Sequence, residues 1–196
     1  PISNCYIVYD KEIRKAVIAD PGDHGSGIAQ YVDQIPDVEI VAILLTHGHG
    51  DHFKGLSELV SICPVPVYIP ADDAFRLKTC EGGFVDASYD IRPEDILVHD
   101  GDHLSIGGME IDVIHTPGHT EGGTCYYFKE NGILLSGDTL FCHSWGRTDF
   151  EGGDEAALFR SIREKLLPLP EDTIVLPGHE GTTTIGEERM VHGYRE

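Results

Sequence analysis

Short apolar runs separated by polar breaks make up most of the chain. Eight of these runs have the length and composition of β-strands, and they cover residues 4–9, 16–19, 39–45, 65–69, 110–114, 124–128, 133–135 and 173–176. The breaks at Asp10-Lys11 and at Glu130-Asn131-Gly132 are compact and polar. We therefore expect the first two runs to form one hairpin and the sixth and seventh runs to form another.

Three stretches between the strands have apolar residues at helical spacing: residues 27–35, 55–61 and 155–167. The third is preceded by Asp154, a suitable N-cap. Strand and helix candidates alternate along the whole chain, without a change of composition that would mark a linker and without an internal repeat. The pattern predicts a single α/β domain over residues 1–196, with four layers in the order helix, sheet, sheet, helix.

The charge of the chain excludes one class of partner. There are 14 Lys and Arg residues against 34 Asp and Glu residues, a net charge of −20. Such a chain repels polyphosphate unless it has a dense basic patch, which the sequence lacks, so nucleic acid is not an expected partner. No apolar run approaches the length of about 18 residues that a membrane span needs. Five cysteines, an odd number with no Cys-x-x-Cys pair, favour a reducing compartment, and we expect a cytoplasmic protein.

The strongest chemical signal is the string Thr46-His47-Gly48-His49-Gly50-Asp51-His52, which directly follows the apolar run 39–45. Three imidazoles and a carboxylate this close together suit zinc, iron or manganese. In an extended loop, alternation would send His47, His49 and Asp51 to one side. We interpret the string as a metal site rather than as a solvated polar loop.

Three further fragments place a polar residue in a glycine-containing turn directly after a strand candidate: Thr116-Pro117-Gly118-His119-Thr120, Ser136-Gly137-Asp138-Thr139 and Leu176-Pro177-Gly178-His179. Each fragment alone is an ordinary turn. If their strands run in the same direction, the loops converge at one edge of a sheet, where rigid scaffolds commonly carry functional groups. We therefore expect His119, Asp138 and His179 to join the histidine string.

With these motifs in this order, the sequence resembles the metallo-β-lactamase superfold, and more closely its small, single-domain glyoxalase II-like hydrolases. The resemblance runs from Asn4-Cys5-Tyr6 and Ala19-Asp20-Pro21-Gly22 to Gly146-Arg147-Thr148-Asp149-Phe150 and the tail at 184–189. It implies an αββα sandwich with the motif loops at the edge between the two sheets. Carried over to this sequence, it implies one metal held by His47, His49 and His119, a second held by Asp51, His52 and His179, and Asp138 as the bridge.

The resemblance also implies an activity. Its two divalent metal ions are expected to be zinc, with iron or manganese as alternatives. A hydroxide bridging the metals, with Asp51 and Asp138 as the catalytic carboxylates, would attack the carbonyl of a small-molecule substrate. A thiolate is a stable leaving group, so the expected substrate is a thioester or a related ester.

Two features limit which members of this family the sequence resembles. Glyoxalase II proper has an additional helical domain that supplies much of its glutathione site. We expect no such C-terminal domain here, which leaves the acyl group and the thiol carrier open. The commonest β-lactamase subclass has a cysteine where Asp138 stands and no histidine at the position of His52, so β-lactam hydrolysis is not expected.

Three other functions stay open. A persulfide dioxygenase would hold a single Fe(II) with His47, His119 and Asp138. A lactonase would use the same bridging hydroxide on a cyclic ester. A scaffold module would bind metal without catalysis, although a structural zinc site normally needs only four ligands. The number of bound metals separates the dioxygenase from the hydrolase.

Residues near the motif loops have less specific interpretations. Asp149 either orients a ligand histidine or pairs with Arg147, and the sequence favours neither. Cys142 and His143 follow Asp138 closely enough to lie at the mouth of the site. A redox role for Cys142 needs neighbours that stabilise a thiolate, which the sequence does not specify.

Overall fold

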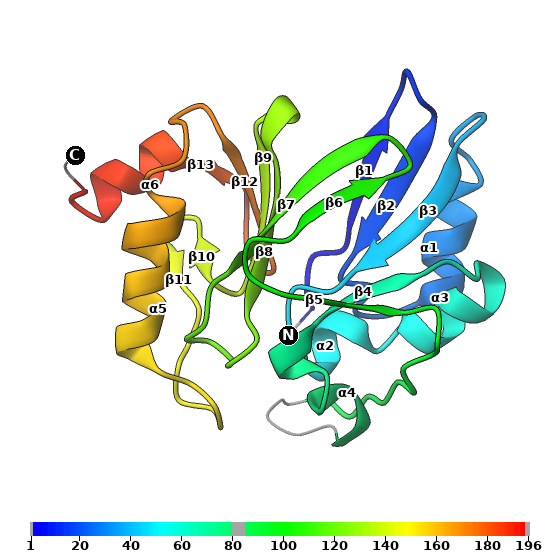
Figure 1. Cartoon of the computed structure of the whole chain (residues 1–196), viewed down its shortest axis with the longest axis horizontal. Helices are drawn as coiled ribbons and strands as arrows, with labels where there is room; N and C mark the ends of the chain where they lie inside the picture. The colour runs from blue at the N-terminus through cyan, green and yellow to red at the C-terminus, as the bar shows by residue number, and fades with distance from the viewer. Residues whose placement is uncertain (1, 80–84, 195–196) are drawn as a thin grey trace.

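The computed structural model describes residues 2–79 and 85–194. Its strands form two main sheets (Figure 1). The first sheet has the order β1-β2-β3-β4-β5, made of Tyr6–Asp10, Lys15–Ala19, Glu39–Leu44, Val67–Pro70 and Ile96–Val98. In this sheet β1 is antiparallel to β2, whereas β2 to β5 run parallel to one another.

The second sheet has the order β13-β12-β9-β8-β7-β6. Its strands are β6 (His103–Ile106), β7 (Met109–His115), β8 (Thr124–Phe128), β9 (Ile133–Gly137), β12 (Ile174–Pro177) and β13 (Thr183–Thr184). β12 is parallel to β9, and the other neighbours are antiparallel. Because β8 is antiparallel to both β7 and β9, the strands β7, β9 and β12 point the same way. β10 (Leu140–Phe141) and β11 (Ser144–Trp145) form a separate short hairpin.

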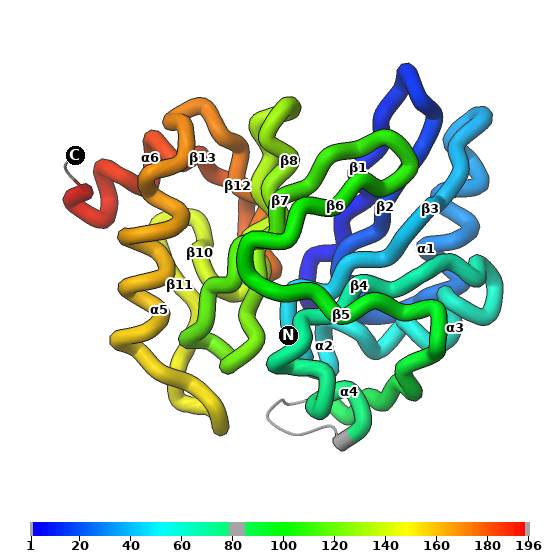
Figure 2. Tube along the Cα trace, in the orientation of Figure 1, coloured from blue at the N-terminus to red at the C-terminus, as the bar shows by residue number. Residues whose placement is uncertain are grey.

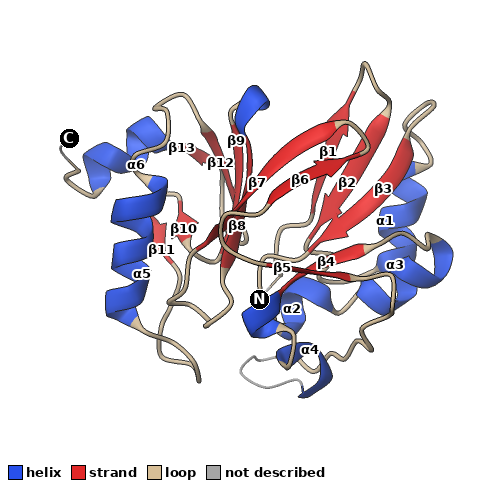
Figure 3. Ribbon diagram, viewed as in Figure 1, coloured by secondary structure: helices blue, strands red, loops and turns tan. Residues whose placement is uncertain are grey.

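Helices lie on the outer side of each sheet (Figure 3). The first sheet is covered by α1 (Gly25–Val32) and α3 (Leu56–Ile62), and the second by α5 (Glu155–Ser161) and α6 (Ile185–Val191). The remaining α-helices of the described residues, α2 (Gly50–Phe53) and α4 (Arg76–Thr79), are single turns. None of the helices in the described ranges is long and apolar enough to cross a bilayer.

Three clusters of buried apolar side chains fill the spaces between these layers. Ile43 of β3 packs with Leu59 in the cluster between the first sheet and its helices. The next residue, Leu44, points to the opposite face and packs in the cluster between the two sheets. Leu158 and Val175 belong to the third cluster, between the second sheet and α5. The chain therefore forms the four-layer αββα sandwich that the sequence predicts, and the predicted fold class is confirmed.

All eight predicted strand runs contain strands, with ends displaced by no more than two residues. Both predicted hairpins form, as β1–β2 and β8–β9. The sequence pattern missed β5, β6, β10, β11 and β13. These strands are only two to four residues long, which is too short for a clear alternating pattern, although Ile96-Leu97-Val98 of β5 is itself a short apolar run.

The three predicted helices also form. Asp154 caps α5 as expected, because its side chain accepts a hydrogen bond from the Ala157 N–H at 2.9 Å. The predicted helix 155–167 changes character after Ser161 and continues as a π-helix over Ile162–Leu166. The sequence pattern missed α6, whose last turn exposes Met190 and Val191 and so blurs the amphipathic pattern.

Tyr126 joins the two sheets near the edge where the motif loops begin. The residue lies on β8 in the second sheet and is fully buried in the cluster between the sheets. Its hydroxyl donates a hydrogen bond to the Leu45 carbonyl, at the end of β3 in the first sheet, over 2.8 Å. The residue after Leu45 is Thr46, where the histidine string starts. This bond therefore fixes the base of the string against the opposite sheet.

We expect Tyr126→Phe to lower the free energy of unfolding by about 1–3 kcal/mol, because it leaves a buried carbonyl without its donor. Urea denaturation monitored by circular dichroism measures this change. The matched control is Tyr127→Phe, since the neighbouring hydroxyl makes no hydrogen bond to the described residues and its loss should cost less. Equal effects of the two substitutions would contradict the role given to the Tyr126 hydroxyl.

Candidate metal centre

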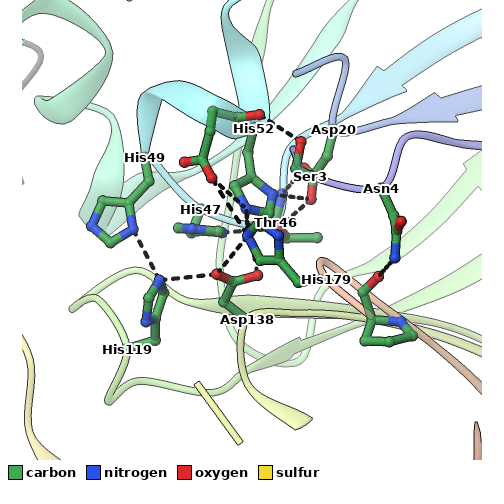
Figure 4. Close-up of polar contacts among 12 residues, drawn as sticks. Ser3, Asn4, Asp20, Thr46, His47, His49, His52, His119, Asp138 and His179 are labelled. Atoms are coloured by element: carbon green, nitrogen blue, oxygen red, sulfur yellow. Dashed lines mark hydrogen bonds and ion pairs between the residues drawn. The ribbon is translucent and has the colours of Figure 1, made fainter. Parts of the chain in front are cut away.

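The four motif loops meet at one edge of the sandwich. The histidine string follows β3, His119 follows β7, Asp138 follows β9 and His179 follows β12. Because β7, β9 and β12 point the same way, their carboxyl ends lie at one edge of the second sheet. The loop after β3 reaches this edge from the first sheet, and the structure brings all seven predicted ligand residues together. Figure 4 labels all of them except Asp51.

The histidine string does not stay extended as the sequence suggested. The backbone is extended at His49, but α2 begins at Gly50, so Asp51 and His52 lie on a helical turn. The expectation that Asp51 alternates with His47 and His49 in an extended loop is therefore wrong. The turn forms because His49 acts as the N-cap and its carbonyl accepts a hydrogen bond from the His52 N–H at 2.9 Å. Gly50 permits close packing, since a Cβ there would lie 2.1 Å from the Val85 carbonyl oxygen.

The side chains form two groups of three. One potential ligand atom from each of His47, His49 and His119 lies within 4.8 Å of the other two. The same holds for Asp51, His52 and His179. The two groups are in contact, because the rings of His47 and His52 lie with centroids 4.1 Å apart.

Asp138 lies between the two groups. Its Oδ2 is 3.3 Å from His119 Nε2 in the first group and 3.4 Å from His179 Nε2 in the second. Its Oδ1 is 3.4 Å from His52 Nε2. The carboxylate is therefore placed to serve both groups, as the bridge in the predicted ligand set would require.

Hydrogen bonds on the far side of four rings fix which nitrogen faces the centre. The Nδ1–H of His119 donates to the Arg147 carbonyl at 2.6 Å, and that of His179 donates to the Ile2 carbonyl at 3.1 Å. A carbonyl only accepts, so the proton is on Nδ1 and the lone pair of the neutral ring is on Nε2. His52 Nδ1 likewise faces the Asp20 carboxylate at 3.0 Å.

His47 follows the same rule through Thr46. The Thr46 hydroxyl donates to Asp20 Oδ2 at 2.6 Å, so it accepts from His47 Nδ1 at 3.0 Å. Nε2 of His47 is then buried with no hydrogen-bond partner among the described residues. A metal ligand needs a lone pair that no hydrogen bond occupies. Without a metal, a buried nitrogen with no hydrogen-bond partner is unfavourable, so proteins normally avoid it. The residues present therefore fit a metal centre.

Asp20 is the main residue that sequence reasoning did not assign to the site. It is 3% exposed at the end of β2 and accepts hydrogen bonds from the Thr46 N–H, the Thr46 hydroxyl and His52. A polar residue directly after a buried strand, followed by Pro21-Gly22, is the signal that could have identified it.

The sequence analysis also did not assign residues 2–4 to the site. Figure 2 shows the start of the chain beside α2, between the two sheets. The Ser3 hydroxyl donates to the Asp51 carbonyl at 2.5 Å, and the Asn4 N–H donates to the Gly178 carbonyl at 2.7 Å. The segment therefore fastens the loop of one sheet to the loop of the other.

Asp149 takes the second of its two sequence interpretations. Its carboxylate accepts two hydrogen bonds from Arg147, at 2.6 and 2.7 Å, in an exposed pair. The group that orients His119 is the backbone carbonyl of Arg147. A backbone group of this kind cannot be identified from residue types.

The two groups differ in their affinity for protons. Burial lowers the pKa of His47, and burial together with the neighbouring His119 lowers that of His49 to about 3. In the second group, hydrogen bonds to Asp138 and Asp51 raise the pKa of His179 to about 9. Although burial opposes it, Asp138 and Asp20 also raise the pKa of His52 well above its usual value. At neutral pH the first group is therefore neutral, whereas a cation that binds the second group must displace protons from its histidines.

Five of the seven side chains form the floor of a pocket of about 310 Å³: His49, Asp51, His119, Asp138 and His179. His47 and His52 lie beneath it and are buried. Its walls are largely aromatic and contain one cationic group: Phe141, Ser144, Trp145, Arg147, Phe150 and Glu180. The Arg147 guanidinium lies 4.2 Å from the centre of the Phe150 ring. The pocket suits a small molecule with an apolar part, bound directly over the polar floor.

Comparisons with known proteins agree with this geometry. A family model described as the metallo-beta-lactamase superfamily matches residues 1–179. Hydroxyacylglutathione hydrolase GloC of Haemophilus influenzae is 34% identical over 194 residues, which cover 95% of this chain and 89% of that protein.

Two solved structures are similar over almost their whole length. BLEG-1, a B3 metallo-beta-lactamase, has a TM-score of 0.82 and 37% identity, over 96% of this chain and 91% of that one. TTHA1623, solved in a di-iron-bound form, has a TM-score of 0.81 and 33% identity, over 96% of this chain and 93% of that one. Together with the two side-chain groups, the fold indicates a dinuclear metal site.

We expect Asp20→Asn to weaken metal binding about 10–100-fold, because an amide cannot accept all the hydrogen bonds that orient Thr46 and His52. Competition with a chromophoric chelator measures the affinity. Asp23→Asn is the matched control, since Asp23 is a nearby exposed carboxylate. An unchanged affinity in Asp20→Asn would show that the buried carboxylate does not support the centre.

Metal binding should depend on pH in two steps. The second metal equivalent has to displace the proton of His179, whose raised pKa of about 9 keeps it protonated at neutral pH. Because the pKa of His52 in the same group is raised as well, the apparent affinity for this equivalent should fall at least about tenfold per pH unit below pH 9, whereas binding to the first group stays nearly constant between about pH 8 and pH 6. Calorimetric titration in buffers of different ionisation enthalpy counts the released protons. Equal proton release by both equivalents would contradict this order.

Proposed function

The chain belongs to the metallo-beta-lactamase superfamily, and we propose that it is a dinuclear metal-dependent hydrolase that acts on a small thioester. One observation carries the proposal: two three-residue groups meet under a pocket, with the Asp138 carboxylate between them. A single structural ion needs only four ligands and no pocket. Seven converging side chains below a cavity are typical of a catalytic centre.

We assign the first metal to His47, His49 and His119, the second to Asp51, His52 and His179, and the bridge to Asp138. Imidazole and carboxylate ligands suit zinc, which we propose as the metal, and they also suit iron. The similarity to a protein solved with two iron ions supports iron as the alternative. When bound, two such cations supply a water of lowered pKa as nucleophile and Lewis-acid polarisation of a carbonyl.

The protein's own residues prepare this chemistry. Burial opposes the charge of Asp138, but His52 and His179 hold the pKa of its carboxyl well below the usual range, so it stays ionised. Burial likewise opposes the charge of Asp51, and its hydrogen bond with His179 keeps the Asp51 pKa low. Two carboxylates therefore face the pocket floor as anions, placed to accept hydrogen bonds from an attacking water and to orient it.

The pocket walls favour a substrate with an apolar portion and a good leaving group. Phe141, Trp145 and Phe150 restrict water around the bound molecule. An amine leaving group needs a side chain that donates a proton to it. Among the described pocket residues, the imidazole whose pKa is raised is that of His179, which belongs to the proposed ligand set. The described pocket walls therefore offer no separate proton donor. A thiolate leaves without one, since its conjugate acid has a pKa near 8.5. The similarity to a hydroxyacylglutathione hydrolase supports the same substrate class.

β-Lactam hydrolysis is a second candidate, because a structure named as a B3 metallo-beta-lactamase is 37% identical over 96% of this chain. The sequence argument against it concerned a different subclass, in which a cysteine takes the place of Asp138. That argument does not apply to the B3 subclass, to which the similar structure belongs by its name. The mononuclear Fe(II) dioxygenase and the lactonase stay predictions that the same experiment can separate.

The decisive experiment measures metal per chain by plasma mass spectrometry, on protein purified without chelator, and thiol release from S-lactoylglutathione. We expect two metals per chain and steady thiol release. Asp138→Asn should lower kcat/KM at least about a hundredfold, because correct placement of both cations is worth several kcal/mol in the transition state.

Asp37→Asn is the control, because Asp37 is an exposed carboxylate paired with Arg14 far from the pocket, and its activity should match the wild type. Faster turnover of a cephalosporin than of the thioester would favour the second candidate. One iron per chain, no thiol release and oxygen uptake with a persulfide would replace the hydrolase with the dioxygenase.

A further inference from the structure

A second cluster of potential metal ligands lies outside the seven-residue centre. Cys142 and His143 form the two-residue turn between β10 and β11, and Glu188 lies on α6. One potential ligand atom from each of the three lies within 4.8 Å of the others. Sequence analysis placed Cys142 and His143 at the mouth of the main site, but none of the proposed steps there uses them.

Glu188 is the buried anion of this cluster. It is 0% exposed, and no Lys or Arg lies within 4 Å of its carboxylate in the part of the chain that the structure describes. The carboxylate accepts hydrogen bonds from the His143 N–H at 3.0 and 3.2 Å and from the Thr183 hydroxyl at 2.7 Å. These neutral donors leave the negative charge without a cation, which is costly in a buried position.

An independent observation concerns His192, one turn further along the chain. Its side chain is 7% exposed, and its Nε2 lies 3.6 Å from Glu188 Oε2, too far for a hydrogen bond. Nε2 is buried without any hydrogen-bond partner among the residues described. An unpaired imidazole nitrogen therefore lies beside the same buried carboxylate, as expected where a cation binds close by.

We propose that Cys142, His143 and Glu188 form a third metal site, for zinc or another thiophilic divalent ion, with His192 next to Glu188. A thiolate, an imidazole and a carboxylate are all ligands that zinc accepts. The inference does not depend on the proposed hydrolase activity. The site differs chemically from the main centre, because none of the seven residues there contains sulfur.

The position of this site gives it a structural consequence for the pocket. The turn that holds Cys142 and His143 is flanked by Phe141 and by Ser144 and Trp145, which line the pocket. An ion shared with Glu188 fastens this turn to α6. His143 has a φ of 59°, a conformation that Asn adopts more readily than most residues, so the imidazole can be removed without a change of backbone.

Cobalt(II) is a direct probe, because a thiolate bound to cobalt gives a charge-transfer band in the near ultraviolet, whereas imidazole and carboxylate ligands do not. We expect metal-free protein titrated with cobalt to develop this band at one equivalent beyond those taken by the main centre. Cys142→Ser should abolish the band and lower the bound metal by one equivalent. His143→Asn should weaken binding at this site about tenfold or more.

Two controls make the assignment specific. Cys63→Ser, which changes a half-buried cysteine at the end of α3, should leave the band unchanged. His119→Ala, which damages the main centre, should also retain the band, so failure of the hydrolase proposal and failure of this one are distinguishable. Far-ultraviolet circular dichroism verifies that each variant is folded. The proposal is overturned if no band appears at saturating cobalt, or if Cys142→Ser leaves the band intact.

Discussion

The buried carboxylate of Asp20 is the interaction on which the centre depends. It binds the Thr46 backbone and hydroxyl and the His52 ring, and Thr46 in turn orients His47. One anion at the end of β2 therefore sets the orientation of two imidazoles that belong to different ligand groups. Histidine can bind a metal through either nitrogen, and a hydrogen bond on one nitrogen commits the other to the centre.

The same principle extends across the sandwich. His119 is held by the Arg147 carbonyl and His179 by the Ile2 carbonyl, so each ring depends on a segment distant in sequence. The hydrogen bond from the Tyr126 hydroxyl to the Leu45 carbonyl fixes the position of the two sheets relative to each other at this edge. A rigid frame matters because the ligand groups of opposite sheets have to meet within a few ångströms, and loops alone would lose too much conformational entropy on binding.

The electrostatics of the site follow from its burial. Three imidazoles packed together remain neutral because burial lowers their pKa values. His52 and His179 face carboxylates, which raise the pKa of His52 well above its usual value and that of His179 to about 9. The two halves of the centre thus differ in protonation although they use similar residues. Residue type alone gives no sign of this difference, because it arises from which charges are neighbours in three dimensions.

The sequence by itself predicted the layer order, eight of the strands and the seven residues that the structure brings together, because apolar periodicity and dense histidine motifs are local signals. It did not determine the helical turn at Asp51, the short edge strands or the support from Asp20, Arg147 and Ile2. Those features consist of hydrogen bonds between residues far apart in the chain. The Cys142, His143 and Glu188 cluster is of the same kind, since the approach of α6 to the β10–β11 turn is decided by how α5 and α6 pack on the second sheet.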